Sequence, residues 1–157
     1  MRDSNLGSII RDEASDSIQA ALDEARQGLE EGGLPIGAVL VRDGGIIGRG
    51  RNRRVQDNDP LAHAEIVCLR DAGRQVSYEG ATLYSTMMPC RLCATAVLYL
   101  GIRKLVVAES ETFAGARDLL EAHGVEVVDL DLEECKRITQ EFIRLNPDLY
   151  AEDTERS

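Results

Sequence analysis

Apolar residues recur every three or four positions near the start of the chain, and this spacing predicts an amphipathic helix. Ser15 or Asp16 can cap its first turn, and Gly32-Gly33 ends it. The apolar positions that share the buried face are Ile18, Leu22, Ala25 and Leu29. The residues before Ser15 are expected to form a short polar end.

An apolar run at residues 36–41 predicts a buried strand. Asp43-Gly44-Gly45 then offers the residues of a tight hairpin turn, so residues 46–49 should return antiparallel beside that strand. A polar loop is expected at residues 51–61. The sheet therefore opens with a hairpin.

The rest of the chain alternates between helical and strand patterns. The predicted helices cover about 63–71, 89–101 with Pro89 in the first turn, 114–122 closed by His123-Gly124, and 132–143. The predicted strands cover 81–85, 104–108 and 125–128. This alternation predicts an α/β fold, a three-layer α/β/α sandwich, and the opening hairpin makes its five-stranded sheet mixed.

Composition indicates one domain over residues 1–157, because 43% of the residues are hydrophobic and no repeat or linker interrupts the chain. The formal net charge is −10 at pH 7, with 28 acidic side chains against 18 lysines and arginines. A polynucleotide-binding surface needs cationic side chains, so no nucleic acid partner is expected. A small uncharged molecule remains compatible with this charge.

The chain contains no run of about 18 apolar residues, so neither a transmembrane helix nor a membrane partner is expected. Its first residues lack the pattern of a signal peptide, and a cytoplasmic location is expected. The four cysteines should therefore be thiols, metal ligands or redox groups. Cys68 and Cys135 show no partner spacing and are interpreted as small buried apolar residues.

Two short motifs carry the chemistry: His63-Ala64-Glu65 at one predicted helix start, and Met88-Pro89-Cys90-Arg91-Leu92-Cys93 at another. Each is weak alone, because a lone histidine is usually a core residue and a lone Cys-x-x-Cys can be a redox pair. Together they match zinc coordination, since two thiolates on one helical turn and a histidine from a neighbouring helix supply three ligands.

Three protein ligands leave the fourth position of a tetrahedral zinc ion open to water, whose pKa falls to about 7 on the metal. Glu65 lies beside the histidine in sequence and is predicted to move protons rather than to bind zinc. Two other readings stay open: Glu65 could only stabilise a helix N-terminus, and the cysteines could form a non-catalytic zinc or redox module.

The sequence resembles the zinc-dependent cytidine and deoxycytidylate deaminase superfamily, whose nucleobase deaminases carry H-x-E and P-C-x-x-C. It is most similar to the yeast type of cytosine deaminase. The segments that carry this likeness are EGGLPIGAVL (31–40), GRGRN (48–52), HAEI (63–66), PCRLC (89–93), YLGIRKLVVAES (99–110) and FIRLNPDLYAED (142–153). The resemblance implies a cytidine deaminase-like fold, one Zn²⁺ per chain and a homodimer.

The resemblance also assigns roles to single residues. His63, Cys90 and Cys93 would bind zinc, and Glu65 would act as the catalytic residue. The positions that would bind the substrate are Asn52, Ala64, Asp153, Phe113, Tyr150, Ile36 and Met87. Asn52 and Asp153 would read the edge of the base, Phe113 and Tyr150 would form aromatic walls, and residues 146–157 would close over the active site as a C-terminal tail.

The implied reaction is hydrolytic deamination of a free pyrimidine base, cytosine or isocytosine, to uracil and ammonia. The sequence departs from the yeast type at Tyr150, where that type has Trp, and at Met87-Met88, where it has Leu-Ser. A tRNA adenosine deaminase or a guanine deaminase of the same superfamily is the alternative. Arg51, Arg53 and Arg54 form a basic cluster that is interpreted as a solvated loop or a subunit contact.

Overall fold

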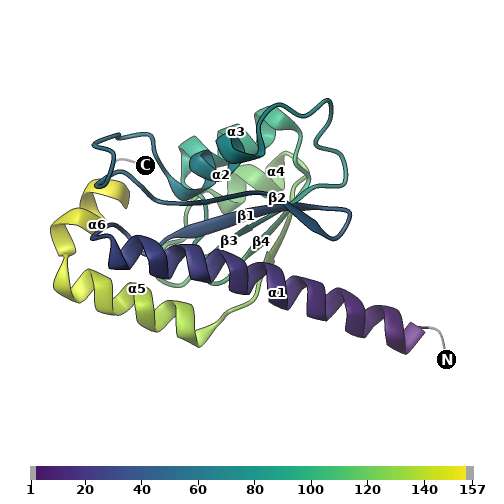
Figure 1. Cartoon of the computed structure of the whole chain (residues 1–157), viewed down its shortest axis with the longest axis horizontal. Helices are drawn as coiled ribbons and strands as arrows, with labels where there is room; N and C mark the ends of the chain where they lie inside the picture. Colours follow the sequence, from purple (N-terminus) through teal and green to yellow (C-terminus); the bar gives the residue numbers. More distant parts are fainter. Residues whose placement is uncertain (1–2, 155–157) are drawn as a thin grey trace.

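The computed structural model describes residues 3–154 (Figure 1). The first helix, α1 (Asp3–Glu30), begins well before the predicted start at Ser15 or Asp16. No proline or glycine pair interrupts the segment that precedes Ser15, so the helical backbone continues through it. The prediction of a short polar end there is therefore wrong for residues 3–14.

A five-stranded mixed sheet forms the centre of the molecule, as predicted. Its strands are β1 (Gly37–Arg42), β2 (Gly45–Arg51), β3 (Thr82–Ser85), β4 (Lys104–Val107) and β5 (Glu126–Asp129). Their order across the sheet is β2-β1-β3-β4-β5. β1 runs antiparallel to both β2 and β3, whereas β3, β4 and β5 are parallel.

The hairpin between β1 and β2 has the tight turn that the sequence predicts. Arg42 pairs with Gly45, which leaves Asp43 and Gly44 as the two turn residues. Both have positive φ angles, 52° and 75°, as a type I′ turn requires. β2 runs on through Arg51, so the loop that follows starts later than expected.

Helices cover both faces of the sheet, which confirms the three-layer sandwich (Figure 1). The helices are α2 (Ala64–Ala72), α3 (Arg91–Leu100) and α4 (Arg117–Ala122) on one face, and α1 and α5 (Glu133–Leu145) on the other. α3 begins at Arg91 with Cys90 as its N-cap. Pro89 therefore precedes the helix and does not occupy its first turn, which corrects the prediction for this residue.

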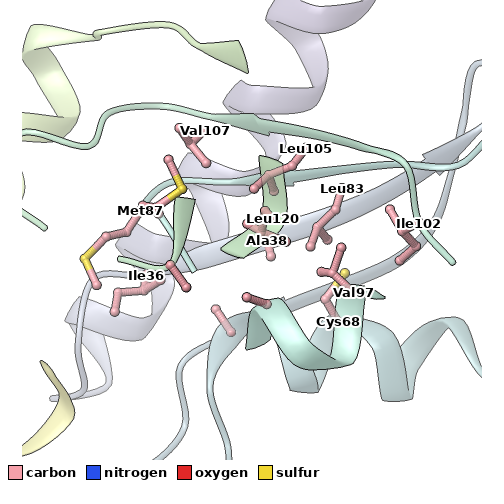
Figure 2. Packing of buried hydrophobic residues seen from close by; sticks show 14 of the residues in the cluster. Ile36, Ala38, Cys68, Leu83, Met87, Val97, Ile102, Leu105, Val107 and Leu120 are labelled. Carbon is pink, nitrogen blue, oxygen red and sulfur yellow. The ribbon is translucent and has the colours of Figure 1, made fainter. Parts of the chain in front are cut away.

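Alternating side chains on the strands divide the core in two. Val39, Tyr84 and Val106 pack toward α1 and α5. Their neighbours Leu40, Leu83 and Leu105 pack in the cluster that contains α2, α3 and α4. Figure 2 shows the second cluster, with Ile36 and Met87 close together at one end and Ile102 at the other.

Glycines of β2 allow α2 to lie directly against this edge strand. A Cβ atom on Gly50 would stand 2.4 Å from the backbone nitrogen of Cys68, and one on Gly48 would stand 2.6 Å from the Cys68 carbonyl oxygen. Any larger residue would push α2 away from the sheet. These two glycines therefore set the position of the helix that begins just after His63.

A last helix, α6 (Pro147–Thr154), follows α5, and no helix was predicted there. Pro147 stands at its first position, where proline is well tolerated because that backbone needs no N–H donor. Asp153 is the buried residue of α6, and Leu149 and Tyr150 pack against the core. Within residues 3–154, no helix is long and apolar enough to cross a membrane.

Candidate zinc-dependent active site

The site lies where several strands begin or end at the same edge of the sheet. Ile36 stands just before β1, and Met87 lies shortly after the end of β3. Because β1 and β3 are antiparallel, these two residues meet, as Figure 2 shows. Phe113 follows the end of the parallel strand β4. Ligands of open α/β sheets commonly bind at the carboxyl ends of such strands.

Two helix starts bring the candidate metal ligands together. His63 is the N-cap of α2, Cys90 is the N-cap of α3, and Cys93 lies in the first turn of α3. The donor atoms of these residues all lie within 4.8 Å of one another. His63 Nδ1 is 3.5 Å from Cys90 Sγ. One imidazole nitrogen and two sulfurs in such a cluster are a donor set that zinc prefers.

The two sulfurs of this cluster are electrostatically coupled. A hydrogen bond from Cys93, aided by His63, lowers the pKa of Cys90 to about 4 despite burial. The interaction with Cys90, together with burial, raises the pKa of Cys93. Burial opposes protonation of His63, but Cys90 and Asp153 outweigh it and raise its pKa. The donor set of one imidazole and two cysteine sulfurs, with Cys90 already shifted toward its thiolate, fits zinc as the cofactor of these three residues.

Glu65, in the first turn of α2, is buried beside the metal ligands. The hydroxyl of Ser85, at the end of β3, lies 2.9 Å from Glu65 Oε1 and can donate to it. Burial raises the pKa of the Glu65 carboxyl. A carboxyl whose pKa is moved toward neutrality is suited to accept and return a proton.

A small cavity of about 10 Å³ adjoins these groups. Its lining residues are Ile36, Asn52, His63, Glu65, Met87, Met88, Cys90, Phe113 and Asp153. The structure therefore brings together most of the site residues named from the sequence. Cys93, Ala64 and Tyr150 do not line the cavity, although Cys93 belongs to the ligand cluster. Ala64 is buried as the first residue of α2, and the Tyr150 hydroxyl donates to the carbonyl of Thr112 at 3.1 Å.

Asn52 and Asp153 meet at the wall of the cavity, although they are 101 positions apart in the sequence. The Asn52 amide nitrogen is 3.5 Å from Asp153 Oδ1, and the Asn52 amide oxygen accepts from the backbone N–H of Arg54 at 3.1 Å. Asp153 Oδ1 also lies 3.7 Å from His63 Nε2. Burial raises the pKa of Asp153, while His63 and Arg54 oppose this shift.

Arg54 is buried next to Asp153, which corrects its interpretation as part of a solvated loop. Its Nη1 lies 3.2 Å from Asp153 Oδ1, and its Nη2 lies 3.3 Å from Glu152 Oε1. Arg51 and Arg53 instead form more exposed ion pairs. Their partners are Glu24, Glu31 and Asp57.

Arg54, Ser85 and Met88 contribute to the site and were not named from the sequence as site residues. The sequence does not distinguish Arg54 from Arg51 and Arg53, because only the folded chain brings Arg54 next to Asp153. Cys68 and Cys135 are buried free thiols away from the ligand cluster, as expected. Burial raises the pKa of Cys135 to about 11, so this thiol stays protonated at neutral pH.

Sequence comparison adds a family to this geometry. Residues 11–109 match the family model described as the cytidine and deoxycytidylate deaminase zinc-binding region. Cytosine deaminase from Candida albicans is 37% identical over 139 residues, which cover 87% of this chain and 93% of that protein. A tRNA-specific adenosine deaminase from Agrobacterium fabrum is 43% identical over 102 residues, which cover 63% of this chain and 67% of that protein.

Solved structures give the same picture of the fold. A structure from a study of A-to-I editing by tRNA:A34 deaminases has a TM-score of 0.72 and 36% identity, and the match covers 79% of this chain and 99% of that chain. Guanine deaminase from Nitrosomonas europaea has a TM-score of 0.69 and 27% identity, over 80% of this chain and 82% of that chain. The names of these similar proteins differ in the base, so the choice of substrate has to be argued from the site.

Proposed function

Within the cytidine and deoxycytidylate deaminase family, to which this chain belongs, we propose that the protein deaminates a free pyrimidine base, either cytosine or its isomer isocytosine. Family membership makes it a zinc-binding hydrolase that acts on C–N bonds. The proposed products are uracil and ammonia. Water adds to the ring carbon that bears the amino group, and the bond from that carbon to the amino nitrogen breaks.

His63, Cys90 and Cys93 would hold the metal. When bound, zinc supplies Lewis acidity, which makes water a nucleophile at neutral pH. Glu65 takes up the proton that the attacking water loses and delivers protons to a ring nitrogen and then to the departing amino group. Ser85 keeps the Glu65 carboxyl directed toward the cavity through their hydrogen bond.

The base would be recognised by the remaining cavity residues. The Asn52 amide and the Asp153 carboxylate offer hydrogen-bonding groups to its edge, since both line the cavity. Phe113 stacks on its face, and Ile36 and Met87 contact its apolar atoms. Ala64 and Tyr150 belong to the proposed set but lie outside the cavity lining. Ala64 would support the start of α2, and Tyr150 would hold α6 in place through its bond to the Thr112 carbonyl.

The observation that carries the choice of a free base is the position of Asp153 of α6 in the cavity wall beside Asn52. Segment 146–157 would act as a tail that closes over the base, in a single domain of residues 1–157. A free base has no ribose or phosphate to be held by, so contacts to both its edge and its faces are needed to orient it. A net charge of −10 further disfavours a polynucleotide substrate.

A second candidate follows from similarity, because a tRNA-specific adenosine deaminase and a guanine deaminase are among the related proteins. An enzyme that acts on tRNA should bind its substrate with an affinity that falls steeply as salt increases. A guanine deaminase should release ammonia from guanine and not from cytosine. Both candidates share the zinc ligands and Glu65 with the proposed function, so only a substrate test separates them.

The test is an ammonia-release screen of purified, zinc-loaded protein. The substrates are cytosine, isocytosine, guanine, adenine, their nucleosides and an unmodified tRNA transcript. The proposal expects turnover of cytosine or isocytosine and none of the transcript. The matched control is the Glu65→Gln variant, which must abolish any signal that belongs to this site. Selective turnover of guanine or of tRNA adenosine would overturn the proposal and identify that base as the substrate.

The proposal also includes a cytoplasmic homodimer, since symmetric dimers are the commonest oligomers. Light scattering coupled to size-exclusion chromatography would give the mass directly, against a chain mass of 17.2 kDa.

A further inference from the structure

A groove of about 280 Å³ lies beside the active-site cavity. The residues that line the groove and not the cavity are Arg54, Pro60, Leu61, Arg91, Leu92 and Glu152. His63, Cys90 and Asp153 line both the groove and the cavity, so the two spaces are neighbours separated by these side chains. The groove thus adjoins the metal ligands on the side where α6 ends.

The cavity is too small for any base in this conformation. Its volume of about 10 Å³ is close to the minimum that holds one water molecule. A substrate can therefore enter only after part of the wall moves. Of the wall residues, Asp153 is the one carried by the last helix, and it is the buried residue of that short helix. α6 is for this reason the element whose movement would join the cavity to the groove.

Arg54 connects α6 to the loop that follows β2. Its Nη1 and Nη2 lie 3.2 and 3.3 Å from carboxylate oxygens of Asp153 and Glu152. Its Nε donates to the Pro60 carbonyl at 3.3 Å, which holds the guanidinium in place. The side chain of Arg54 is 7% exposed and that of Asp153 is 4% exposed. Removing Arg54 would leave the buried Asp153 carboxylate without its ion-pair partner, which would weaken the closed position of α6.

The contacts to Asp153 also fix which oxygen faces the substrate. Arg54, Asn52 and the His63 ring are all nearest to Oδ1. With Oδ1 held in this way, Oδ2 is the oxygen that can turn toward a ligand. The planar guanidinium can bond both carboxylates at once, which a lysine ammonium would do less well.

We propose that Arg54 is a positioning residue, which latches α6 over the active site through Asp153 and Glu152 and orients Asp153, and that the adjoining groove is the route by which the base enters. Its role in orienting a base rests on the proposed function, whereas its role as a latch does not. Opening of the latch would move Asp153 away from the cavity and join the two spaces.

The latch is tested by hydrogen exchange of the zinc-loaded, full-length protein without substrate. Arg54→Met keeps much of the apolar stem and removes the charge. Arg53→Met is the matched control, because the ion pairs of Arg53 are with Asp57 and Glu31 and not with α6. Arg54→Met should exchange faster over residues 147–154 with unchanged zinc content, and Arg53→Met should match wild type. Equal exchange of residues 147–154 in the two variants would overturn the latch.

Kinetics on the best substrate of the ammonia screen, whichever base it is, test the orienting role. Arg54→Met should lower kcat/KM by roughly 10- to 100-fold, mainly through a higher KM, because positioning is lost while the metal site and Glu65 are intact. Arg54→Lys should restore part of the loss. In an Asp153→Asn background, Arg54→Met should lower kcat/KM much less, since the carboxylate that Arg54 holds is gone. The same loss in both backgrounds would refute an action through Asp153.

If the proposed substrate is wrong, the ammonia-release screen will show it, and the hydrogen-exchange result will be unaffected. A failed latch would appear in the exchange data even if cytosine is the substrate. Should Arg54→Met fold poorly, the same comparison of Arg54→Lys with Arg53→Lys decides the question, because a lysine retains the charge but loses the forked geometry.

Discussion

Two regions contribute to the same cavity and are built in different ways: the metal corner, which consists of His63, Glu65, Cys90 and Cys93, and the cap, which is helix α6. His63, Cys90 and Cys93 stand at the starts of α2 and α3, and both helices pack on the central sheet with buried residues along their length. α6 has one buried residue, Asp153. The cap is held by the ion pairs of Arg54, by the hydroxyl of Tyr150 and by the partly buried side chains of Leu149 and Tyr150.

This difference separates the chemistry of the site from its recognition of the substrate. Metal ligands and a proton-transfer group need fixed positions, which helices packed on a sheet provide. An element that must admit a substrate needs low local stability, and a short helix with few buried side chains has it. Changes in the metal corner should therefore abolish the chemistry, whereas changes in the cap should weaken binding and leave the metal in place.

The largest effect is expected from Cys93→Ser. A serine hydroxyl is a poor ligand for zinc, so both the metal and the activity should be lost. Zinc content by atomic absorption and ammonia release measure the two losses. Cys135→Ser is the matched control, since Cys135 is buried against α1 and the sheet, away from the cluster, and should keep its zinc. Stoichiometric zinc and full activity in Cys93→Ser would contradict the ligand assignment.

Glu65→Gln should lower the turnover of the substrate while the zinc stays bound. Glutamine keeps the size of the side chain but cannot accept the proton, so turnover should fall by about 10² to 10⁴. Zinc content should equal that of wild type, because Glu65 is not part of the ligand cluster. Loss of zinc in this variant would show that the residue holds the metal and would end its assignment as the proton carrier.

Truncation after Asn146 removes α6 and tests the cap as a whole. Metal content should survive, because His63, Cys90 and Cys93 all lie outside α6. Turnover of the base should fall by about 10² or more, since orientation by Asp153 is lost. The measurements are zinc content, thermal unfolding and kcat/KM on the best substrate. A truncated protein that works at the full-length rate would mean that recognition resides entirely in the remaining wall.

The metal corner could be predicted from sequence because its signal is local. His63 and Glu65 are two residues apart, Cys90 and Cys93 three apart, and each pair sits at a helix start that the surrounding pattern also indicates. The sheet was predictable for the same reason, since apolar runs and the Asp43-Gly44 turn act over a few residues. Local patterns of this kind specify an element and the side chains that it presents.

The cap could not be predicted in this way, because its contacts join residues about a hundred positions apart in sequence. Arg54 resembles Arg51 and Arg53 in sequence, and only the return of α6 makes it buried. α6 itself is short and weakly patterned, so no helix was predicted there. The position of Asp153 rested on resemblance alone. Non-local ion pairs are determined by the completed fold and leave no periodic signal in the chain.

The smallest effect is expected from Tyr150→Phe, which keeps the ring on the core and removes only the hydroxyl bond to the Thr112 carbonyl. Burial raises the pKa of Tyr150 to about 12, so the hydroxyl stays a protonated donor at neutral pH. Loss of one such bond costs about 0.5 to 1.5 kcal/mol, which is at most roughly tenfold in an equilibrium. The variant should raise KM by no more than this factor, with kcat and zinc content unchanged.

Tyr99→Phe, at an exposed position, is the control and should match wild type in all three measurements. A collapse of kcat in Tyr150→Phe would mean that the hydroxyl takes part in the reaction, and the division between a chemical corner and a binding cap would fail at this residue.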